Sequence, residues 1–185
     1  MGWVFSAFAD EAGATTDIQI AALQRAGINY IDPRNIDGHN ISVLPVDLAK
    51  DIAAKLKAAN ITVNMFGSPI GKIDIADDFI IDLGKLEHLG KLKPIFGCNK
   101  VRLFSYYNKN KAPIGDWQNI TLDRLTKLRD LAAKLGMQLY HENEHAIFGE
   151  TSDRVLTIAQ KLRDTSANGA DRKSTRLNSS HSSVS

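Results

Sequence analysis

The sequence contains a single cysteine, Cys98, among its 185 residues. One cysteine cannot form an internal disulfide, which excludes a disulfide-stabilised scaffold and fits the reducing cytoplasm, where we expect the protein to reside. No apolar run approaches the ~20 residues that a helix needs to cross a bilayer, so we predict no membrane partner. The fingerprint G-x-G-x-x-G is also missing after the first expected strand, where residues 8–13 read FADEAG. That absence argues against a dinucleotide-binding Rossmann domain.

An excess of charge of one sign is also lacking. The formal net charge is +2, and the surplus lies in residues 171–185, where Arg172, Lys173 and Arg176 outnumber Asp171. Without that segment, basic and acidic residues are equal in number. Because a neutral body does not offer the basic surface that nucleic acids require, we predict no nucleic-acid partner.

Residues 171–185 differ from the rest in composition as well. The segment DRKSTRLNSSHSSVS contains six serines and shows no apolar periodicity. A disordered natural tail is one interpretation. The other is an artefact, because DRKSTRLNSSH resembles the translation of a common sequencing-library adapter. We favour the artefact, and therefore expect residues 1–170 to form the natural domain and residues 171–185 to be a non-native, disordered tail.

Apolar residues in the natural part alternate between the period of a strand and the period of a helix. Short runs rich in β-branched and aromatic residues predict strands at 3–8, 28–31, 61–66, 100–106 and 137–142. Amphipathic spacing predicts helices at 15–27, 45–59, 77–96, 121–135 and 151–163. Strands that alternate with helices in this way form a parallel sheet with right-handed crossovers.

Two architectures fit such an alternation, a doubly wound open sheet and a (β/α)8 barrel. A barrel gathers its functional residues at the C-terminal ends of its strands. Polar residues do cluster directly after the expected strands: Asp10, Glu11, Asp32, Arg34, Asp37, His39, Ser68, Lys72, Ser105, Tyr106, Tyr107, Glu142, Asn143, Glu144 and His145. This distribution favours the barrel.

Four segments at these strand ends together carry a family resemblance: FADEA, GSPIGKI, KVRLFSYY and LYHENEHAIFGET. Over about residues 4–164 the sequence resembles the xylose isomerase-like barrels, and more narrowly the bacterial sugar phosphate isomerase/epimerase group. Asp32-Pro33-Arg34 departs from the Glu-Leu-Arg expected after the second strand, so no family role passes to Asp32. The resemblance implies a (β/α)8 TIM barrel that is truncated here after about five βα units.

The resemblance also implies a divalent metal near the barrel axis. Its ligands would be a glutamate at the end of the fifth strand, then an aspartate, a histidine and a glutamate from later strands. Glu142 matches the first ligand and is also the candidate base, and the other ligands are expected beyond Ala170. Oxygen ligands suit Mg²⁺ or Mn²⁺, and a histidine in the missing part would admit Zn²⁺ or Co²⁺. The alternative for Glu142 is a solvated strand-end carboxylate. The neighbouring His141 leaves the other face of the strand, and is expected to face the helices or an adjacent strand.

Further candidates for substrate binding follow the strands. Arg34 and Lys72 are placed to meet a phosphate or carboxylate, or are merely solvated. Tyr106 is a candidate to stack on a sugar ring, or packs in the core. His145 is expected in a loop near the pocket, and Glu144 either orients a ligand or is a surface charge.

These observations favour a metal-dependent sugar or sugar-phosphate isomerase or epimerase, which moves a proton at carbon through a metal-stabilised enediolate. Its partner would be a small-molecule sugar or sugar phosphate, and a homo-oligomeric full-length protein is left open. One alternative is a related barrel enzyme, either an abasic-site endonuclease or a polyol dehydratase or oxidoreductase. The other is a non-catalytic fragment, because five of eight strands cannot close a barrel and leave strand edges unpaired.

Overall fold

The structure, a computed structural model, describes residues 4–163 and the backbone of residues 175–178. The chain divides into two compact units. The first unit comprises Met1–Ser68 with Glu87–Val101, and the second comprises Pro69–Leu86 with Arg102–Ser185. Two elements pass from one unit into the other, namely α3 (Ile80–Phe96) and β6 (Lys100–Leu103). Each unit therefore joins segments that are far apart in the sequence.

The first unit is built on a parallel three-stranded sheet with the order β1-β2-β5. Its elements are β1 (Ser6–Ala7), η1 (Ala9–Glu11), α1 (Thr16–Ala26), β2 (Tyr30–Ile31), β3 (Asn35–Ile36), β4 (His39–Asn40), η2 (Ile41–Val43), α2 (Val46–Ala58) and β5 (Thr62–Val63). In the register Ser6 pairs with Tyr30, and Tyr30 pairs with Thr62. A parallel bridge between Phe66 and Val101 extends the pairing to β6. The short strands thus follow one another in chain order, as the βα alternation predicts.

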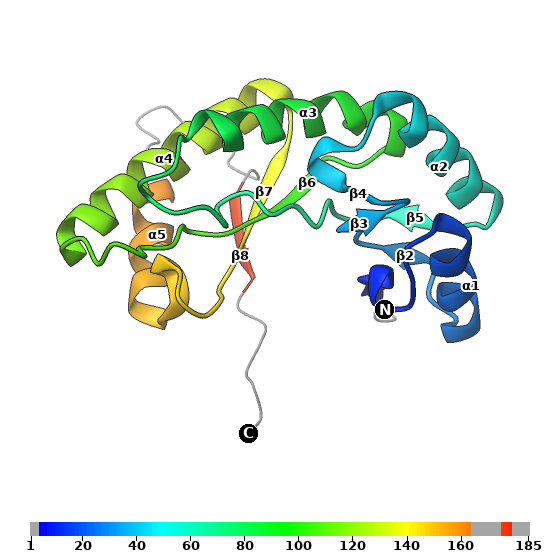
Figure 1. The fold of residues 1–185 in the computed structure, drawn as a ribbon, viewed down its shortest axis with the longest axis horizontal. Helices are drawn as coiled ribbons and strands as arrows, with labels where there is room; N and C mark the ends of the chain where they lie inside the picture. The colour runs from blue at the N-terminus through cyan, green and yellow to red at the C-terminus, as the bar shows by residue number, and fades with distance from the viewer. Residues whose placement is uncertain (1–3, 164–174, 179–185) are drawn as a thin grey trace. The chain divides into compact units, whose positions relative to one another are not determined.

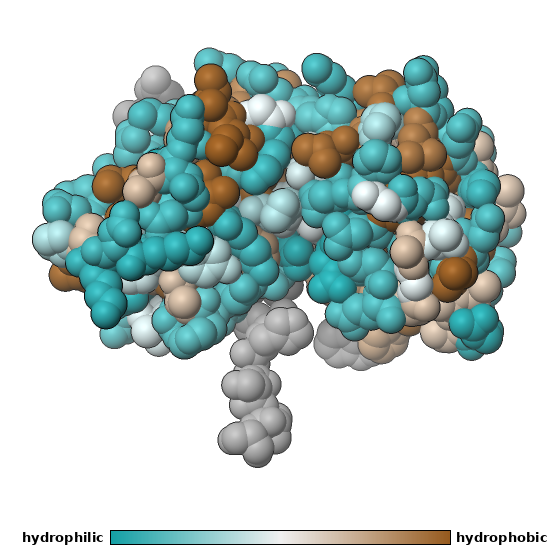
Figure 2. Space-filling view, viewed as in Figure 1, coloured by the Kyte–Doolittle hydropathy of each residue, from teal (hydrophilic) through white to brown (hydrophobic). Residues whose placement is uncertain are grey.

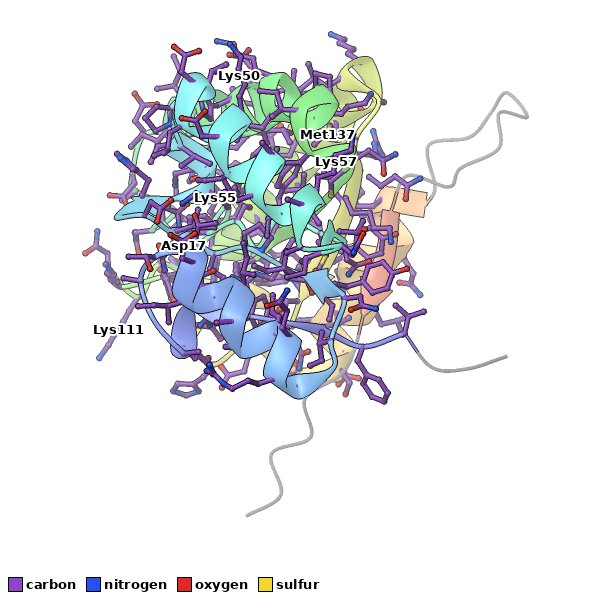
Figure 3. The ribbon with its side chains drawn as sticks, turned by 90° about the vertical axis from the view of Figure 1, so that its right-hand side faces the viewer. Asp17, Lys50, Lys55, Lys57, Lys111 and Met137 are labelled. Carbon is purple, nitrogen blue, oxygen red and sulfur yellow. The ribbon has the colours of Figure 1, made fainter. Side chains whose placement is uncertain are left out.

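Helices α1 and α2 pack beside this sheet and beside each other (Figure 1). Thr15 caps the start of α1 by accepting a hydrogen bond from the backbone N–H of Ile18, and Gly27 ends the helix with a φ of 67°. Figure 3 shows Asp17 of α1 and Lys55 of α2, which form an ion pair at 2.9 Å. Both side chains are largely exposed, so the apolar faces hold the helices together and this pair adds little.

The second unit contains the sheet β6-β7-β8, in which β7 is Gln138–Glu142 and β8 is Thr175–Asn178. Its other elements are α4 (Ile114–Leu135), η3 (Phe148–Glu150) and α5 (Ser152–Arg163). Its buried apolar side chains include residues of β6, α4, β7, α5, η3 and the loop before η3: Leu103, Leu125, Leu128, Ala132, Leu139, Ile147, Phe148, Ile158 and Leu162. The helices thus bury their apolar stripes against one face of the sheet.

Two helices begin elsewhere than the sequence pattern predicts. Helix α3 begins at residue 80 rather than 77, because the Asp78 carboxylate accepts the backbone N–H of Ile80. Helix α4 begins at residue 114 rather than 121, directly after Pro113, whose carbonyl accepts from both Asp116 and Trp117. Trp117 therefore belongs to the first turn of α4. Its ring packs edge-on against the ring of Phe148, with 5.6 Å between the ring centroids.

A two-stranded antiparallel hairpin, β3–β4, was not anticipated. It turns at Asp37 and Gly38, whose φ angles of 47° and 80° are those of a tight hairpin turn. The Asp37 carboxylate also accepts the backbone N–H of Thr16 at 2.8 Å, which ties the hairpin to the start of α1. The Asp-Gly pair is a hairpin signal, and the absence of flanking apolar alternation hid it.

The segment 171–185 was expected to carry no regular structure, and β8 differs from that expectation for residues 175–178. The strand runs parallel to β7, with Leu139 opposite Thr175 and Glu142 opposite Asn178. An unpaired strand edge presents a row of backbone N–H and C=O groups, which almost any extended segment can satisfy. The remainder of 171–185 lies outside the described residues.

The described helices include none that is both long and apolar enough to span a membrane. The face drawn in Figure 2 is mainly hydrophilic, with hydrophobic areas between the polar side chains. Large apolar side chains are exposed singly at several helix starts, including Val46, Ile80, Ile81 and Ile114. Isolated exposed apolar residues of this kind are ordinary on protein surfaces.

Candidate active site

In the first unit, Arg34, which follows β2, is held by two carboxylates that follow β1. Its Nε donates to both carboxylate oxygens of Asp10, at 3.0 and 3.1 Å, and its Nη2 donates to Glu11 at 2.9 Å. The guanidinium also lies over the ring of Phe8, 4.6 Å from its centroid. Burial opposes the charge, but the hydrogen bonds to Asp10 and Glu11 raise the pKa of Arg34. The charge that we expected to meet an anionic substrate is therefore already compensated within the unit.

A second polar group in the first unit links three neighbouring strands. Asn64, which follows β5, donates to the carboxylate of Asp32 at 2.9 Å, and Lys100 at the start of β6 donates to Asn64 at 3.1 Å. Burial raises the pKa of Asp32, while the hydrogen bond from Asn64 works in the opposite direction. Asp32 is the position at which the sequence departs from the Glu-Leu-Arg pattern. It is the last acceptor in a series of hydrogen bonds that runs from Lys100 through Asn64. Sequence reasoning did not identify Asn64 or Lys100.

In the second unit, the alternation of β7 separates two kinds of side chain. Leu139 and His141 are buried, whereas Gln138, Tyr140 and Glu142 are half-buried on the opposite face. His141 lines a small cavity of about 10 Å³ together with residues of β6, β7, α4 and α5: Leu103, Leu125, Arg129, Leu139, Ile158 and Leu162. This apolar burial lowers the pKa of His141 to about 4. His141 therefore faces the helices as a neutral residue, as expected, and Glu142 faces away from them.

Glu142 lies at the C-terminal end of β7 beside a buried arginine that the sequence analysis did not select. Nη1 of Arg102, on the adjacent strand β6, is 3.5 Å from Oε2 of Glu142. The side chain of Arg102 is only 8% exposed, while that of Glu142 is 27% exposed. The guanidinium is thus buried next to a carboxylate that remains partly exposed to solvent.

A second ion pair stands next to the first. Nζ of Lys72 lies 2.6 Å from Oε2 of Glu144, and both side chains are about one-third exposed. The ring of Phe104 contacts both cations of the two pairs, since its centroid is 4.3 Å from Nζ of Lys72 and 4.9 Å from Cζ of Arg102. Cation–π contacts of this kind fix the positions of charged groups that would otherwise move freely. The buried ring thus brings together Lys72, Arg102, Glu142 and Glu144.

The position of Lys72 is set by the residue before it. Gly71 has a φ of 82°, and a Cβ there would lie 2.2 Å from the carbonyl oxygen of Phe104. The backbone N–H of Gly71 donates at 2.8 Å to Asp82, a carboxylate of α3 that is fully buried and also pairs with Lys85. Only glycine fits this backbone conformation so close to the carbonyl of Phe104. The loop after β5 is therefore held tightly against the chain at the end of β6.

Tyr107 follows β6 close to Glu144 of the second ion pair. Burial together with the negative charge of Glu144 raises the pKa of Tyr107. Its backbone is paired on both sides, since its N–H donates to Ile73 at 3.0 Å and its carbonyl accepts from Ile75 at 2.9 Å. The phenol is therefore a neutral group attached to a backbone that is held in place.

Two of the residues predicted to bind substrate, Tyr106 and His145, lie outside the two ion pairs described above. Tyr106 is completely buried, with its ring against Phe79 and the guanidinium of Arg124. This corrects its assignment as a sugar-stacking residue: its φ of 63° directs the side chain into the core, and the packing alternative fits. His145 is 90% exposed in the loop after β7, and its Nδ1 lies 2.6 Å from Glu150.

The described residues include no group of three or more His, Cys, Asp or Glu side chains that could hold a metal ion. Glu142 is the predicted metal ligand, and the guanidinium of Arg102 lies 3.5 Å from its carboxylate. A carboxylate in such a position suits a hard cation, but a single carboxylate does not make a metal site. The described residues therefore do not form a complete metal site.

A groove of about 510 Å³ in the first unit is not at the strand ends discussed above. It is lined by the end of α2, the start of β5 and the end of α3, including Leu56, Asn60 and Phe96. These residues lie at the N-terminal ends of the strands, where barrel folds carry stability rather than catalysis. We therefore place the candidate site at the other ends, around Glu142.

No protein-family model and no curated protein matches the sequence. Among solved structures, the chain is similar to a xylose isomerase-like TIM barrel protein from Mycobacterium smegmatis in complex with magnesium, with 16% identity and a TM-score of 0.66 over 88% of this chain and 56% of that one. It is also similar to the probable 3-DHS dehydratase AsbF from Bacillus anthracis, with 18% identity and a TM-score of 0.69 over 96% and 62%. An L-ribulose 3-epimerase gives 18% identity and a TM-score of 0.65 over 94% and 59%.

This chain has the xylose isomerase-like barrel fold. The prediction of a TIM barrel is thereby confirmed, and the chain spans 56–62% of the length of these three proteins. Other structures with the same fold are the IOLI protein with a bound zinc atom and an AP endonuclease of family 2 from Brucella melitensis. All these identities are below one-fifth, so the likeness establishes the fold and leaves the chemistry to be argued from the side chains.

Proposed function

We propose that this chain carries the first part of the active site of a sugar isomerase or epimerase, an enzyme that moves a proton at carbon. The observation that supports it is the position of Glu142, at the C-terminal end of a parallel strand, directed away from the helices and partly exposed beside Arg102. Catalytic groups of barrel enzymes occupy such positions. Similar structures include epimerases, and the proposal extends that chemistry to this chain.

Glu142 would act as the base. A carboxylate can accept the proton from a carbon next to a carbonyl group, and Arg102, 3.5 Å away, would help to hold it in position. Returning the proton to the adjacent carbon gives isomerisation, and returning it to the other face of the same carbon gives epimerisation. A divalent metal, when bound, would stabilise the negative charge that forms on the substrate oxygens. Glu142 would provide one of its ligands, and the others would come from outside the described residues.

The test uses the protein encoded by the intact gene that contains residues 1–170. The protein is incubated in D₂O with a panel of aldoses, ketoses and their phosphates, with and without added Mg²⁺, Mn²⁺, Zn²⁺ or Co²⁺. We expect metal-dependent exchange of one carbon-bound hydrogen, measured by NMR. Glu142→Gln should slow this exchange by about 100-fold or more, as expected for the loss of a general base. Glu87→Gln, an exposed glutamate of α3, is the matched control and should leave the rate unchanged.

Two outcomes would replace the proposal. Nicking of abasic DNA, without exchange on any sugar, would assign the chain to the endonucleases, one of which shares its fold. Loss of water from a polyol, without return of the proton to carbon, would assign it to the dehydratases, which the fold also includes. Exchange that survives unchanged in Glu142→Gln would show that Glu142 is not the base.

A further inference from the structure

Beyond the end of β6, the backbone is bonded to the loops that follow β5 and β7. We call residues 104–107 the β6 extension. Toward the loop after β5, the N–H of Tyr106 donates to the carbonyl of Gly71 at 2.8 Å. Toward the loop after β7, Tyr107 and Ile147 form an antiparallel bridge. The β6 extension therefore joins two loops that are far apart in the sequence.

Ser105 adds a side-chain contact to this backbone pairing. Its Oγ accepts the backbone N–H of Gly149 at 2.7 Å, and its carbonyl accepts the N–H of Phe148 at 3.1 Å. Ser105 is 0% exposed, and Gly149 is buried as well. A buried N–H that lacks a partner costs free energy, so the hydroxyl of Ser105 stabilises this position of the loop after β7.

Gly149 is enclosed between Ser105 and His141. A Cβ at Gly149 would lie 2.8 Å from Oγ of Ser105 and 2.6 Å from Cε1 of His141, so no side chain fits between them. The φ of Gly149 is −80°, which any residue adopts, so the close approach requires glycine here and the backbone angle does not. The loop after β7 is thus held directly against His141, the residue before Glu142.

This contact supports the backbone from which Glu142 projects. Residues 143–149 leave β7 after Glu142 and are held again at Gly149. His141 and Glu142 are consecutive and leave opposite faces of β7. A shift of the His141 ring, against which Gly149 packs, therefore turns the backbone at Glu142. A displacement of about 1 Å can lower the rate of an enzyme by about 100-fold, so the support is relevant to the proposed base.

We propose that Ser105 is a positioning residue, which sets the direction of the Glu142 carboxylate by holding Gly149 against His141. Ser105 is fully buried, so it acts through the loop after β7 and does not touch a substrate. The inference rests on the proposed function for its effect on turnover. Its effect on the Glu142 carboxylate requires no substrate and is measured by itself.

The first experiment uses the 185-residue chain and three variants. Ser105→Ala removes the hydroxyl, and Ser105→Cys replaces it with a thiol of similar size that accepts hydrogen bonds only weakly. Ser42→Ala is the matched control, because Ser42 is 1% exposed in η2 of the first unit and its hydroxyl donates to Asn40 at 2.7 Å. All three variants lose a buried serine hydroxyl, so a loss of stability alone does not distinguish them.

Two NMR measurements distinguish the variants. One is the hydrogen exchange of the Gly149 amide, and the other is the ¹³C signal of the Glu142 carboxylate, assigned with Glu142→Gln. In both Ser105 variants, exchange at Gly149 should accelerate about tenfold or more, and the Glu142 signal should shift. Ser42→Ala should change neither. Faster exchange at Gly149 with an unchanged Glu142 signal would refute the inference, and so would a failure of both Ser105 variants to fold.

Turnover by the intact-gene protein separates this inference from the proposed function. Ser105→Cys should lower kcat about tenfold or more with little change in KM, because the base is displaced while the groups that bind substrate stay in place. Ser42→Ala should change neither constant. An active enzyme whose kcat is unaltered in Ser105→Cys would refute the positioning role alone. A shifted Glu142 signal in a protein that exchanges no hydrogen on any sugar would refute the proposed reaction alone.

Discussion

The burial of His141 predicts that acid destabilises the fold through one residue. His141 is 3% exposed, and its neighbours from α4, α5 and β6 are apolar except for Arg129. Burial lowers its pKa from 6.5 to about 4. In the unfolded chain it would titrate with its ordinary pKa of 6.5. Between these two values the unfolded state binds more protons than the folded state, so lowering the pH favours unfolding. The contribution is intact above pH 6.5 and is lost as the pH falls toward 4.

The size of the effect follows from the two pKa values. Proton linkage for a single site gives a loss of about 2 kcal/mol between pH 7 and pH 5, and about 3 kcal/mol by pH 4. Other groups also titrate in this range, so the contribution of His141 has to be isolated by difference. His141→Leu replaces the ring with an apolar side chain of similar volume that does not titrate, and His145→Gln removes an exposed histidine instead.

The assay is urea unfolding followed by circular dichroism at pH 7, 6 and 5. The free energy of unfolding of the wild type should fall, relative to that of His141→Leu, by about 2 kcal/mol between pH 7 and pH 5. The His145→Gln variant should follow the wild type. In parallel, the imidazole NMR signal of His141 should show no titration until the pH approaches 4. A constant difference between wild type and His141→Leu across the pH range would refute the reasoning.

Four further substitutions are tested by the same unfolding assay. Gly71→Ala should destabilise the fold by about 3 kcal/mol, because its φ is positive and a Cβ there would meet the backbone of Phe104. Gly84→Ala in α3, where a Cβ meets nothing within 4 Å, should instead stabilise the fold by about 0.5–1 kcal/mol. Equal effects of the two substitutions would contradict the close approach at Gly71. Leu128→Ala empties a fully buried position of α4 and should cost about 2–5 kcal/mol; a cost below 1 kcal/mol would show that the site is not packed as described. Lys55→Ala breaks an exposed ion pair and should leave the unfolding midpoint where it is, so a clear loss would mean that this pair matters more than its exposure allows.

The sequence by itself determined the features that depend on local periodicity. The alternation of apolar patterns predicts the order of strands and helices, and the fold agrees with it. Successive side chains of a strand alternate in direction, which predicts that His141 and Glu142 of β7 leave opposite faces. The clustering of polar residues after the strands predicts which end of the strands carries the candidate site.

Only the tertiary structure decided which of those polar residues meet. The partner of Glu142 is Arg102, and the partner of Lys72 is Glu144, because strand register and loop conformation bring together positions 40 or more residues apart. Tyr106 and Tyr107 are adjacent in sequence, yet Tyr106 is completely buried and Tyr107 is only partly buried. Contacts of this kind depend on the path of the whole chain, and no local pattern of residues specifies them.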